Sequence, residues 1–425
     1  MAKEDPITLV IGAGIVGLAC AYYLHVQGRS VCVIHDAPLD ETASCGNAGA
    51  IAMAEIIPLA GPGTLLKAPK WLLDPTGPLS IRAGYTLKLW PWFWRFVKAG
   101  TPANRRALTQ AMATLLKTAF EDHQTVLDAS KLNHLLNKQG SLFVYRNERG
   151  RRADRASWDL RRDCGLEFKA LDRAGVLAYE PALGPLAHCG YRVEDWAHYR
   201  DPGELVLGLA AYLKSQGVMF EVGQVKQILV ENNKPTGVQL VGGKINPCAH
   251  VVVAAGAWSA ELSNPLGDYV PLETERGYNT TLENPGVEVK SFVTYAQDQF
   301  VMTAMQMGLR IGGAVELAGL DAPPNYNRSK ELLRLAKKYV PDLNTDGGTV
   351  WMGHRPSTPD SVPVISPSQN VKNVYYAFGH GHLGLTGSMT TGRLIADLMA
   401  GKTPGIDLSP FYVGRFAHPY HIGRF

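Results

Sequence analysis

The sequence predicts an α/β fold in which a parallel-sheet domain is interrupted by inserted segments. An apolar, β-branched strand, a glycine turn and a helix open the chain at residues 7–24, and a second apolar run follows much later at 249–256. A strand, a glycine-rich turn and a helix recur near the end, at 374–399. Because buried parallel strands read as nearly continuous apolar runs, we expect the first two runs to share one sheet. The domain that they build is therefore interleaved with another domain.

The first unit, Ile-Thr-Leu-Val-Ile-Gly-Ala-Gly-Ile-Val-Gly at 7–17, has the glycine spacing of a dinucleotide-binding turn. Gly12 permits the tight turn, Gly14 lets a pyrophosphate approach the backbone, and Gly17 lets helix and strand pack closely. The start of the helix adds unpaired N–H groups and the positive end of the helix dipole. Since a strand precedes the glycines and a helix follows them, the segment predicts a Rossmann-type dinucleotide site.

The remaining elements follow from hydrophobic periodicity and from glycine and proline positions. Residues 29–36 predict the second parallel strand, and a glycine-containing loop follows at 42–49. The region 64–135 is mostly helical in pattern. Further helices are expected at about 150–163, 204–215 and 329–339, and further strands at 140–145, 218–222, 225–231, 237–241 and within 290–317.

Composition bounds the function. The chain has 425 residues, of which 46% are hydrophobic and 19% charged, which is enough for two domains of a globular protein. A net charge of +4 is too small for a nucleic-acid surface, so we expect no nucleic-acid partner. The cysteines lack the spacing of metal ligands or of a disulfide framework, which predicts a reducing compartment and no metal site. They are Cys20, Cys32, Cys45, Cys164, Cys189 and Cys248.

The segment 71–98 leaves two interpretations open. No cationic and apolar leader precedes Ile7, and no apolar run reaches the ~18–20 residues of a membrane span, so we expect a cytoplasmic protein. However, half of the eight tryptophans fall within this segment, interspersed with basic residues. These aromatic residues either pack onto the core or seat a helix peripherally on the inner face of a membrane. The residues concerned are Trp71, Trp90, Trp92 and Trp94, with Lys88, Arg95 and Lys98.

The glycine-rich turn at 379–386 distinguishes between dinucleotides. It places a second helix start where it can stabilise negative charge, and a reduced flavin ring carries such charge. A nicotinamide enzyme has no need of this second site. The two glycine turns together favour a flavin.

The chain resembles the FAD-dependent amino-acid oxidoreductases of the D-amino-acid oxidase superfamily, and within it the bacterial D-amino-acid dehydrogenases. The resemblance extends essentially from end to end. It implies non-covalent FAD and a Rossmann-type FAD-binding domain of residues 1–75, 186–260 and 345–425. This domain is interleaved with an α+β, mainly antiparallel β-sheet substrate-binding domain of residues 76–185 and 261–344. The segments that carry the resemblance are 12–17, 44–49, 254–259, 353–360 and 378–386.

The resemblance also implies which residues hold the cofactor. Members usually carry an acidic residue at the end of the second strand for the adenosine ribose, but His35 stands there and Asp36 follows. Either Asp36 takes over this role or the ribose is held differently. The residues assigned to FAD are Gly12, Ala13, Gly14, Ile15, Gly17, Asp36, Ser44, Gly46, Asn47, Ala48, Gly49, Ala255, Gly256, Gly379, Gly381, His382, Leu383, Gly384, Leu385 and Thr386.

For catalysis, the resemblance implies that Arg355 binds the substrate carboxylate and that Tyr278 lies over the substrate. A guanidinium suits a carboxylate because it binds both oxygens and stays charged. Arg276 and Arg310 are rival ligands for this carboxylate. His382, like His354 and His380, is expected to shape the pocket or bind the flavin rather than act as a base, because water can take the amine proton.

The function implied is oxidation of a D-amino acid to the imino acid, with hydride transfer from Cα to flavin N5 and electrons passed to a quinone or another acceptor. The motifs resemble most those of relatives that act on cyclic substrates such as D-hydroxyproline or D-proline. Two alternatives remain: an O₂-using oxidase of glycine, sarcosine or similar N-substituted amino acids, and a non-catalytic flavin-binding subunit of a larger complex.

Overall fold

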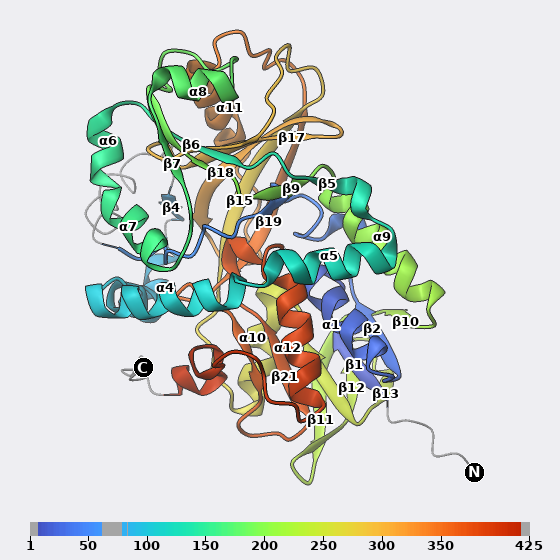
Figure 1. Cartoon of the computed structure of the whole chain (residues 1–425). Helices are drawn as coiled ribbons and strands as arrows, with labels where there is room; N and C mark the ends of the chain where they lie inside the picture. Colours follow the sequence, from blue (N-terminus) through green and yellow to red (C-terminus); the bar gives the residue numbers. More distant parts are fainter. Residues whose placement is uncertain (1–6, 62–78, 83, 418–425) are drawn as a thin grey trace.

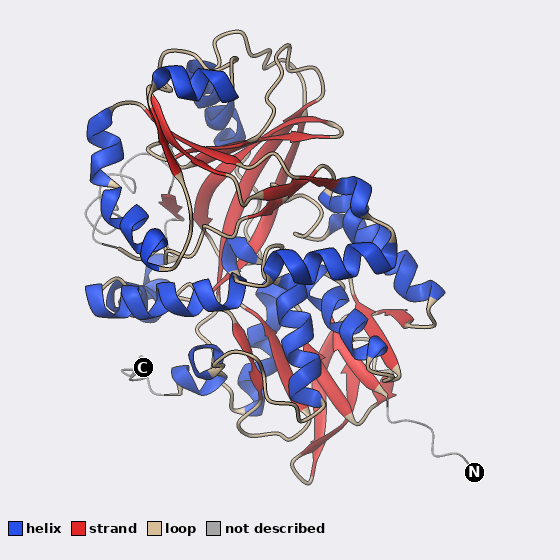
Figure 2. Cartoon of the chain, viewed as in Figure 1, coloured by secondary structure: helices blue, strands red, loops and turns tan. Residues whose placement is uncertain are grey.

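The computed structural model describes residues 7–61, 79–82 and 84–417. Two large sheets dominate it, one in each half of the molecule (Figures 1 and 2). The smaller of the two is six-stranded, in the order β10-β2-β1-β14-β21-β20, and it is parallel except for β20. Its strands are β1 Thr8–Ile11, β2 Val31–His35, β10 Met219–Val222, β14 His250–Val253, β20 Val364–Pro367 and β21 Val374–Phe378.

The central place of β1 between β2 and β14 confirms the predicted parallel sheet and its assembly from distant segments. One face of the sheet packs against α1 Ile15–Val26, α9 Pro202–Ser215 and α12 Ser388–Met399. The other face packs against a small sheet of β11 Val225–Glu231, β12 Lys234–Leu240 and β13 Ile245–Pro247, and against α10 Ser259–Ser263. The inner strands β1, β2, β14 and β21 are largely buried on both faces, which explains why they read as continuous apolar runs.

The larger sheet has nine strands and is mainly antiparallel, as predicted for the substrate-binding domain. Its order is β19-β15-β18-β17-β16-β6-β8-β7, and β4 pairs with β18. Helices α8 Arg173–Tyr179 and α11 Asn327–Tyr339 contribute to the core that packs on it. The strands are β4 Leu79–Ile81, β6 Ser141–Tyr145, β7 Lys169–Leu171, β8 Cys189–Val193, β15 Glu273–Leu282, β16 Phe292–Tyr295, β17 Phe300–Met305, β18 Gly308–Leu317 and β19 Thr349–Ser357.

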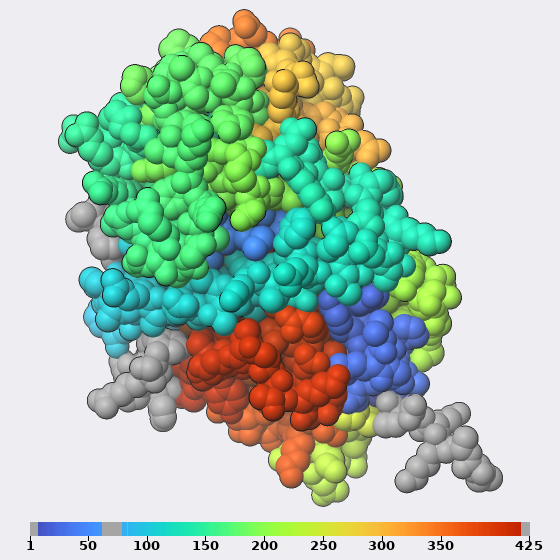
Figure 3. Space-filling model, in the orientation of Figure 1, coloured from blue at the N-terminus to red at the C-terminus, as the bar shows by residue number. Residues whose placement is uncertain are grey.

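The remaining helices lie between the two sheets or, like α6 (Glu148–Ala153) and α7 (Arg155–Asp163), beside the nine-stranded sheet (Figure 1). The helices α4 (Pro102–Leu116) and α5 (Ala119–Ser130) run across the middle of the face shown in Figure 3, between the C-terminal part and residues 140–200. The predicted helical pattern of 64–135 is confirmed over 86–130, whereas 62–78 lie outside the described residues. These elements are α3 Thr86–Ala99, α4 Pro102–Leu116, α5 Ala119–Ser130, α6 Glu148–Ala153 and α7 Arg155–Asp163, with a small sheet of β3 Ala50–Ile51, β5 Leu136–Asn137 and β9 Ala197–Tyr199.

The predicted domain boundaries differ from the sheet pairing at two strands. Boundaries at 186 and 345 assign β8 and β19 to the FAD-binding part, but both strands pair within the nine-stranded sheet. The strand β19 has no clear alternation of apolar and polar residues, and it contains Gly353 and Pro356. Its pairing with β15 along nine residues is a long-range contact that periodicity does not reveal. The division into domains itself stays a prediction.

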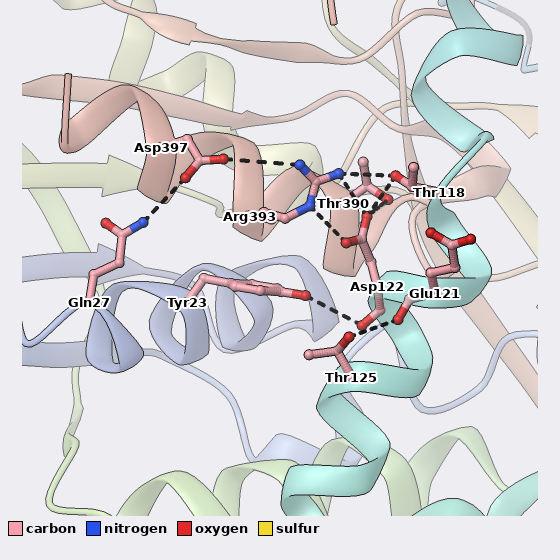
Figure 4. Close-up of polar contacts among 9 residues, drawn as sticks. All are labelled: Tyr23, Gln27, Thr118, Glu121, Asp122, Thr125, Thr390, Arg393 and Asp397. Carbon is pink, nitrogen blue, oxygen red and sulfur yellow. Dashed lines mark hydrogen bonds and ion pairs between the residues drawn. The ribbon is translucent and has the colours of Figure 1, made fainter. Parts of the chain in front are cut away.

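Helices α1 and α12 pack unusually closely, and a polar network holds α5 against them. A Cβ atom on Gly392 would lie 2.5 Å from the backbone carbon of Ala19. The buried Asp122 carboxylate accepts hydrogen bonds from Arg393 Nε at 2.7 Å and Nη2 at 3.0 Å, and from Thr390 and Thr118 (Figure 4). The Arg393 guanidinium thereby balances the charge of Asp122, and the helices α1, α5 and α12 pack as one unit.

We predict that Gly392→Ala destabilises the protein by about 1–3 kcal/mol, because the added methyl group must push α12 away from α1. The measurement is the free energy of unfolding in a denaturant titration. Gly405→Ala is the matched control, since a Cβ there meets nothing within 4 Å. An equal effect of the two substitutions would show that the helices do not need this close contact.

Candidate active site

A cavity of about 1110 Å³ lies between the two large sheets. One wall comes from the turn after β1, the end of β2 and the loop after β14. The opposite wall comes from β15, β18 and β19 of the nine-stranded sheet. A ligand in the cavity therefore contacts both halves of the molecule.

The turn between β1 and α1 has the geometry of a phosphate-binding turn. Gly12 adopts φ +107°, and a Cβ atom there would lie 2.3 Å from the Ala254 carbonyl oxygen. Gly17 packs on the Gly12 carbonyl, so it supports the turn from behind. Gly14 lines the cavity, and the backbone N–H of Ile15 donates to Ser44 Oγ at 2.9 Å. These close-packed glycines and the N–H groups at the helix start fit the pyrophosphate of FAD.

The residues predicted to lie beside the adenosine, Asp36, Ala255 and Gly256, line the cavity together with His35. His35 is the last residue of β2, and its Nδ1 lies 2.9 Å from the Ala37 carbonyl oxygen. Nδ1 of His35 is therefore already engaged by a carbonyl of its own loop. Asp36 and Glu41 both bring a carboxylate to the cavity lining, and the contact of Asp36 with the ribose stays a prediction.

The loop 44–49 is held by the nine-stranded sheet. Asn279 Nδ2 donates to the Gly46 carbonyl at 2.7 Å, and Arg310 Nη1 donates to the Asn47 carbonyl at 2.6 Å. Arg310 Nε also donates to Thr281 Oγ1 at 3.0 Å. Arg310, a rival carboxylate ligand in the sequence, thus positions the loop.

The glycine-rich turn before α12 contributes both to the cavity wall and to its support. The region 381–385 lines the cavity. Thr386 lies behind it, where its Oγ1 donates to the Ala50 carbonyl at 3.1 Å. His123 Nε2 lies 3.0 and 3.1 Å from the carbonyl oxygens of Leu385 and Thr386. Burial lowers the pKa of His123 to about 4, so it is a neutral support below this turn.

The structure brings most of the predicted cofactor residues to one cavity and places the others behind its wall. Gly17, Gly46, Gly49, Gly379 and Thr386 pack against backbone or side chains and do not line it. Those that line it are Gly12, Ala13, Gly14, Ile15, Asp36, Ser44, Asn47, Ala48, Ala255, Gly256, Gly381, His382, Leu383, Gly384 and Leu385.

Arg355 lies on the wall opposite the phosphate turn, directly across from Glu275 on the neighbouring strand. A Cβ atom on Gly277 would lie 2.2 Å from Arg355 Nη2, so the guanidinium lies across a residue that has no side chain. Arg355 Nη1 donates to the Ala314 carbonyl at 3.0 Å. Burial raises the pKa of Glu275 and lowers that of Arg355, and each charge opposes the shift of the other. The two form an opposite-charge pair on the cavity wall.

Tyr278 does not share the face of Arg355. Successive side chains of a strand point to opposite faces, and Tyr278 is three residues from Glu275. Its hydroxyl donates to Glu316 and accepts from the Asn325 N–H at 3.1 Å. Tyr278 lines the cavity, but its hydroxyl is engaged on the other face of the sheet, and its place over the substrate stays a prediction. Arg276, also on the opposite face, donates to the carbonyls of the 319–323 loop.

All three candidate histidines line the cavity, and His382 is the one whose pKa Arg355 affects. Burial, with a smaller contribution from Arg355, lowers its pKa to about 4. Burial lowers the pKa of His380 to about 3, and its Nε2 lies 2.9 Å from Thr391 Oγ1. His354 Nδ1 lies 2.8 Å from Thr274 Oγ1. Neutral histidines agree with the expectation that they shape the pocket.

Sequence reasoning missed three residues of this wall: Glu275, Asn279 and Trp351. Glu275 stands in the segment that contains Tyr278, and its strand position was the available signal. No local signal in the sequence points to Trp351, because only the fold brings its ring against Gly46. A Cβ atom on Gly46 would lie 2.0 Å from the Trp351 ring.

The parallel sheet with its glycine turn, joined to an antiparallel sheet that closes the cavity, defines a dinucleotide-dependent oxidoreductase. A family model described as FAD dependent oxidoreductase matches residues 8–398. The chain belongs to this family, and its cofactor is FAD, which confirms the predicted family and flavin.

Two curated relatives align with nearly the whole chain. A D-amino-acid oxidase of Bradyrhizobium diazoefficiens is 36% identical over 96% of this chain and 98% of its own. A D-amino acid dehydrogenase of Granulibacter bethesdensis is 30% identical over 96% and 99%. Among solved structures, glycine oxidase from Geobacillus kaustophilus has a TM-score of 0.73 at 20% identity, covering 97% of this chain and 99% of its own. The last likeness shows the fold.

Three further observations concern the part of the chain that the structure describes. Its cysteines are all free, and no group of three or more His, Cys, Asp or Glu side chains there is arranged to hold a metal ion. Within the same residues, no helix has the length and apolar character needed to cross a membrane.

We predict that Gly46→Ala weakens FAD binding by about tenfold, or 1.4 kcal/mol, because the new methyl group displaces Trp351 or the loop 44–49. The measurement is the FAD dissociation constant, obtained by titrating the apoprotein with flavin. Adding Trp351→Ala to this variant removes the clash and is expected to restore much of the affinity. Unchanged affinity in Gly46→Ala alone would contradict the packing described.

Proposed function

We propose that the protein oxidises a D-amino acid to the imino acid. The observation that carries this proposal is the pair of opposite charges, Arg355 and Glu275, on the cavity wall formed by β15 and β19. An amino acid is a zwitterion, so its recognition needs a cation for the carboxylate and an anion for the ammonium. The names of relatives similar over nearly their whole length support the D-amino-acid class.

In this proposal the chain binds and orients the substrate. The Arg355 guanidinium binds the carboxylate, and Glu275 binds the ammonium group. FAD, held by the phosphate turn and the loop 44–49, would supply the acceptor for the hydride that leaves Cα. His382 stays neutral above pH about 4, so it lines the site without adding a charge beside Arg355. Before the hydride leaves, the ammonium group must lose one proton to become a neutral amine, and in this proposal water takes that proton.

We propose a cyclic substrate such as D-proline or D-hydroxyproline. The resemblance of the 353–360 and 378–386 segments supports this preference, and so do the aromatic side chains of Trp351 and Trp92 in the cavity wall. An apolar ring buries its surface against such side chains at a gain of roughly 25 cal/mol per Å².

For the electron acceptor, we propose a quinone or another carrier, with the protein in the cytoplasm and in peripheral contact with the inner face of the membrane. An O₂-using oxidase is the second candidate, because one relative is named an oxidase.

We predict that the holoenzyme's yellow flavin absorbance bleaches under anaerobic conditions with D-proline, and more slowly with D-alanine. L-Proline and L-alanine serve as controls for the configuration. In air, reduction of a redox dye without peroxide supports a dehydrogenase, whereas rapid peroxide formation assigns the oxidase. A flavin that no D-amino acid bleaches would refute the proposed function.

We predict that Arg355→Ala raises KM by about 10–100-fold, since a charge-assisted hydrogen bond contributes about 1.5–3 kcal/mol. Arg355→Lys keeps the charge and is expected to recover part of the loss. Cyclopentanecarboxylate, a proline analogue without the nitrogen, separates the two roles when tested as a competitive inhibitor. Its inhibition constant should rise in Arg355→Ala and change little in Glu275→Gln, whereas KM for D-proline should rise in both.

The flavin content of each variant is measured as the control for folding. An unchanged KM in Arg355→Ala would reject the assignment of the carboxylate. Equal losses of inhibitor and substrate binding in Glu275→Gln would reject the ammonium site but leave Arg355 in place.

A further inference from the structure

Helix α3 has two apolar faces, and one of them belongs to the core. Leu89, Trp92 and Phe96 are buried. Trp92 Nε1 donates to the Ser357 carbonyl at 3.3 Å, two residues from Arg355. Trp92 and Phe96 also line the flavin cavity. This face confirms the packing interpretation for part of the tryptophan-rich segment.

The other face carries large apolar side chains that the described chain leaves exposed. Leu87 is 89% exposed, Trp90 65% and Trp94 47%. Their spacing of three and four residues places them along one side of the helix. We call these three residues the α3 stripe. Scattered exposed apolar residues are ordinary, but a row of this size marks a contact surface.

The chain segment that contains the α3 stripe is rich in basic residues, although Arg95 is buried and Arg105 lines the cavity. Residues 75–120 contain no Asp or Glu, yet they contain seven basic residues, while the whole chain has a net charge of only +4. Lys88 is exposed next to the stripe, and Lys98 Nζ lies 5.6 Å from the centre of the Trp94 ring. The seven are Arg82, Lys88, Arg95, Lys98, Arg105, Arg106 and Lys117.

We propose that the α3 stripe docks on the surface of an anionic phospholipid bilayer. Tryptophan side chains prefer the boundary between acyl chains and head groups. Neighbouring lysines attract anionic lipid, at about 1 kcal/mol per residue near the surface. A second copy of this chain suits the stripe poorly, because two such surfaces would bring two basic regions together.

This inference specifies the membrane contact that we included in the proposed function, and its biological role rests on that function. The docking itself does not depend on which amino acid the enzyme oxidises. Because α3 has one face in the cavity wall and the other on the bilayer, a lipid-soluble acceptor would meet the protein beside its flavin. The helix lies on the membrane in this arrangement and does not cross it.

The test is co-sedimentation of the full-length holoenzyme with phosphatidylglycerol-containing vesicles and, in parallel, with phosphatidylcholine vesicles. We expect binding to the anionic vesicles that weakens with added salt. Trp90→Ser combined with Trp94→Ser should lower the binding constant by about tenfold or more. Val222→Ser on β10 is the control, since it removes a side chain that is 73% exposed but remote in the fold, and its binding should equal that of the unchanged protein.

Absence of binding to anionic vesicles, or equal binding by the double variant, would overturn the proposal. So would a second copy covering the stripe, seen as a dimer that becomes a monomer in the double variant. Dye reduction with D-proline in solution is measured in parallel and should be unchanged in the double variant, because Trp90 and Trp94 do not line the cavity. Vesicle binding without dye reduction would refute the proposed function and leave the docking in place.

Discussion

The arrangement of the site depends on the contact between the loop 44–49 and the nine-stranded sheet. Asn279 and Arg310 donate to two successive carbonyls of that loop, and the loop's Ser44 accepts from the start of α1. A short chain of hydrogen bonds thus connects the phosphate turn with the sheet that carries Arg355. Because the cavity lies between the two sheets, this connection sets where cofactor and substrate walls stand relative to each other. Burying the Arg310 guanidinium is tolerable since its donors are used.

The glycines of the motifs have two roles, ligand access and close helix packing, and their spacing in the sequence does not tell which glycine has which role. Gly14 and Gly381 leave the cavity wall open to a ligand. Gly17 and Gly392 instead let helices approach backbone closely, which brings α1 against β1 and α12 against α1. The polar network of Asp122 and Arg393 then ties α5 to the same body (Figure 4). The layer behind the cavity wall is therefore closely packed.

The parallel strands, the glycine turn and the last helix could be predicted because each is a local pattern. A strand that is buried on both faces appears as an apolar run, and the glycines that precede a helix stand at fixed spacing in the sequence. The large sheet could be predicted only in outline, since β19 shows no alternation and pairs with a strand far away in the sequence. Arg355 was found by resemblance, but the same reasoning chose Tyr278, whose hydroxyl lies on the other face.

The sequence by itself determined the family, the flavin and the phosphate turn, because these depend on neighbouring residues with fixed spacing. Only the tertiary structure decided what each of the three arginines contacts: Arg355 and Arg310 line the cavity, but Arg310 donates to the loop 44–49 and Arg276 donates to the 319–323 loop, because strand register and sheet face are set by pairing partners. It also placed Glu275 opposite Arg355 and divided the tryptophans of α3 between core and surface. Those choices arise from contacts between distant segments, which no local pattern records.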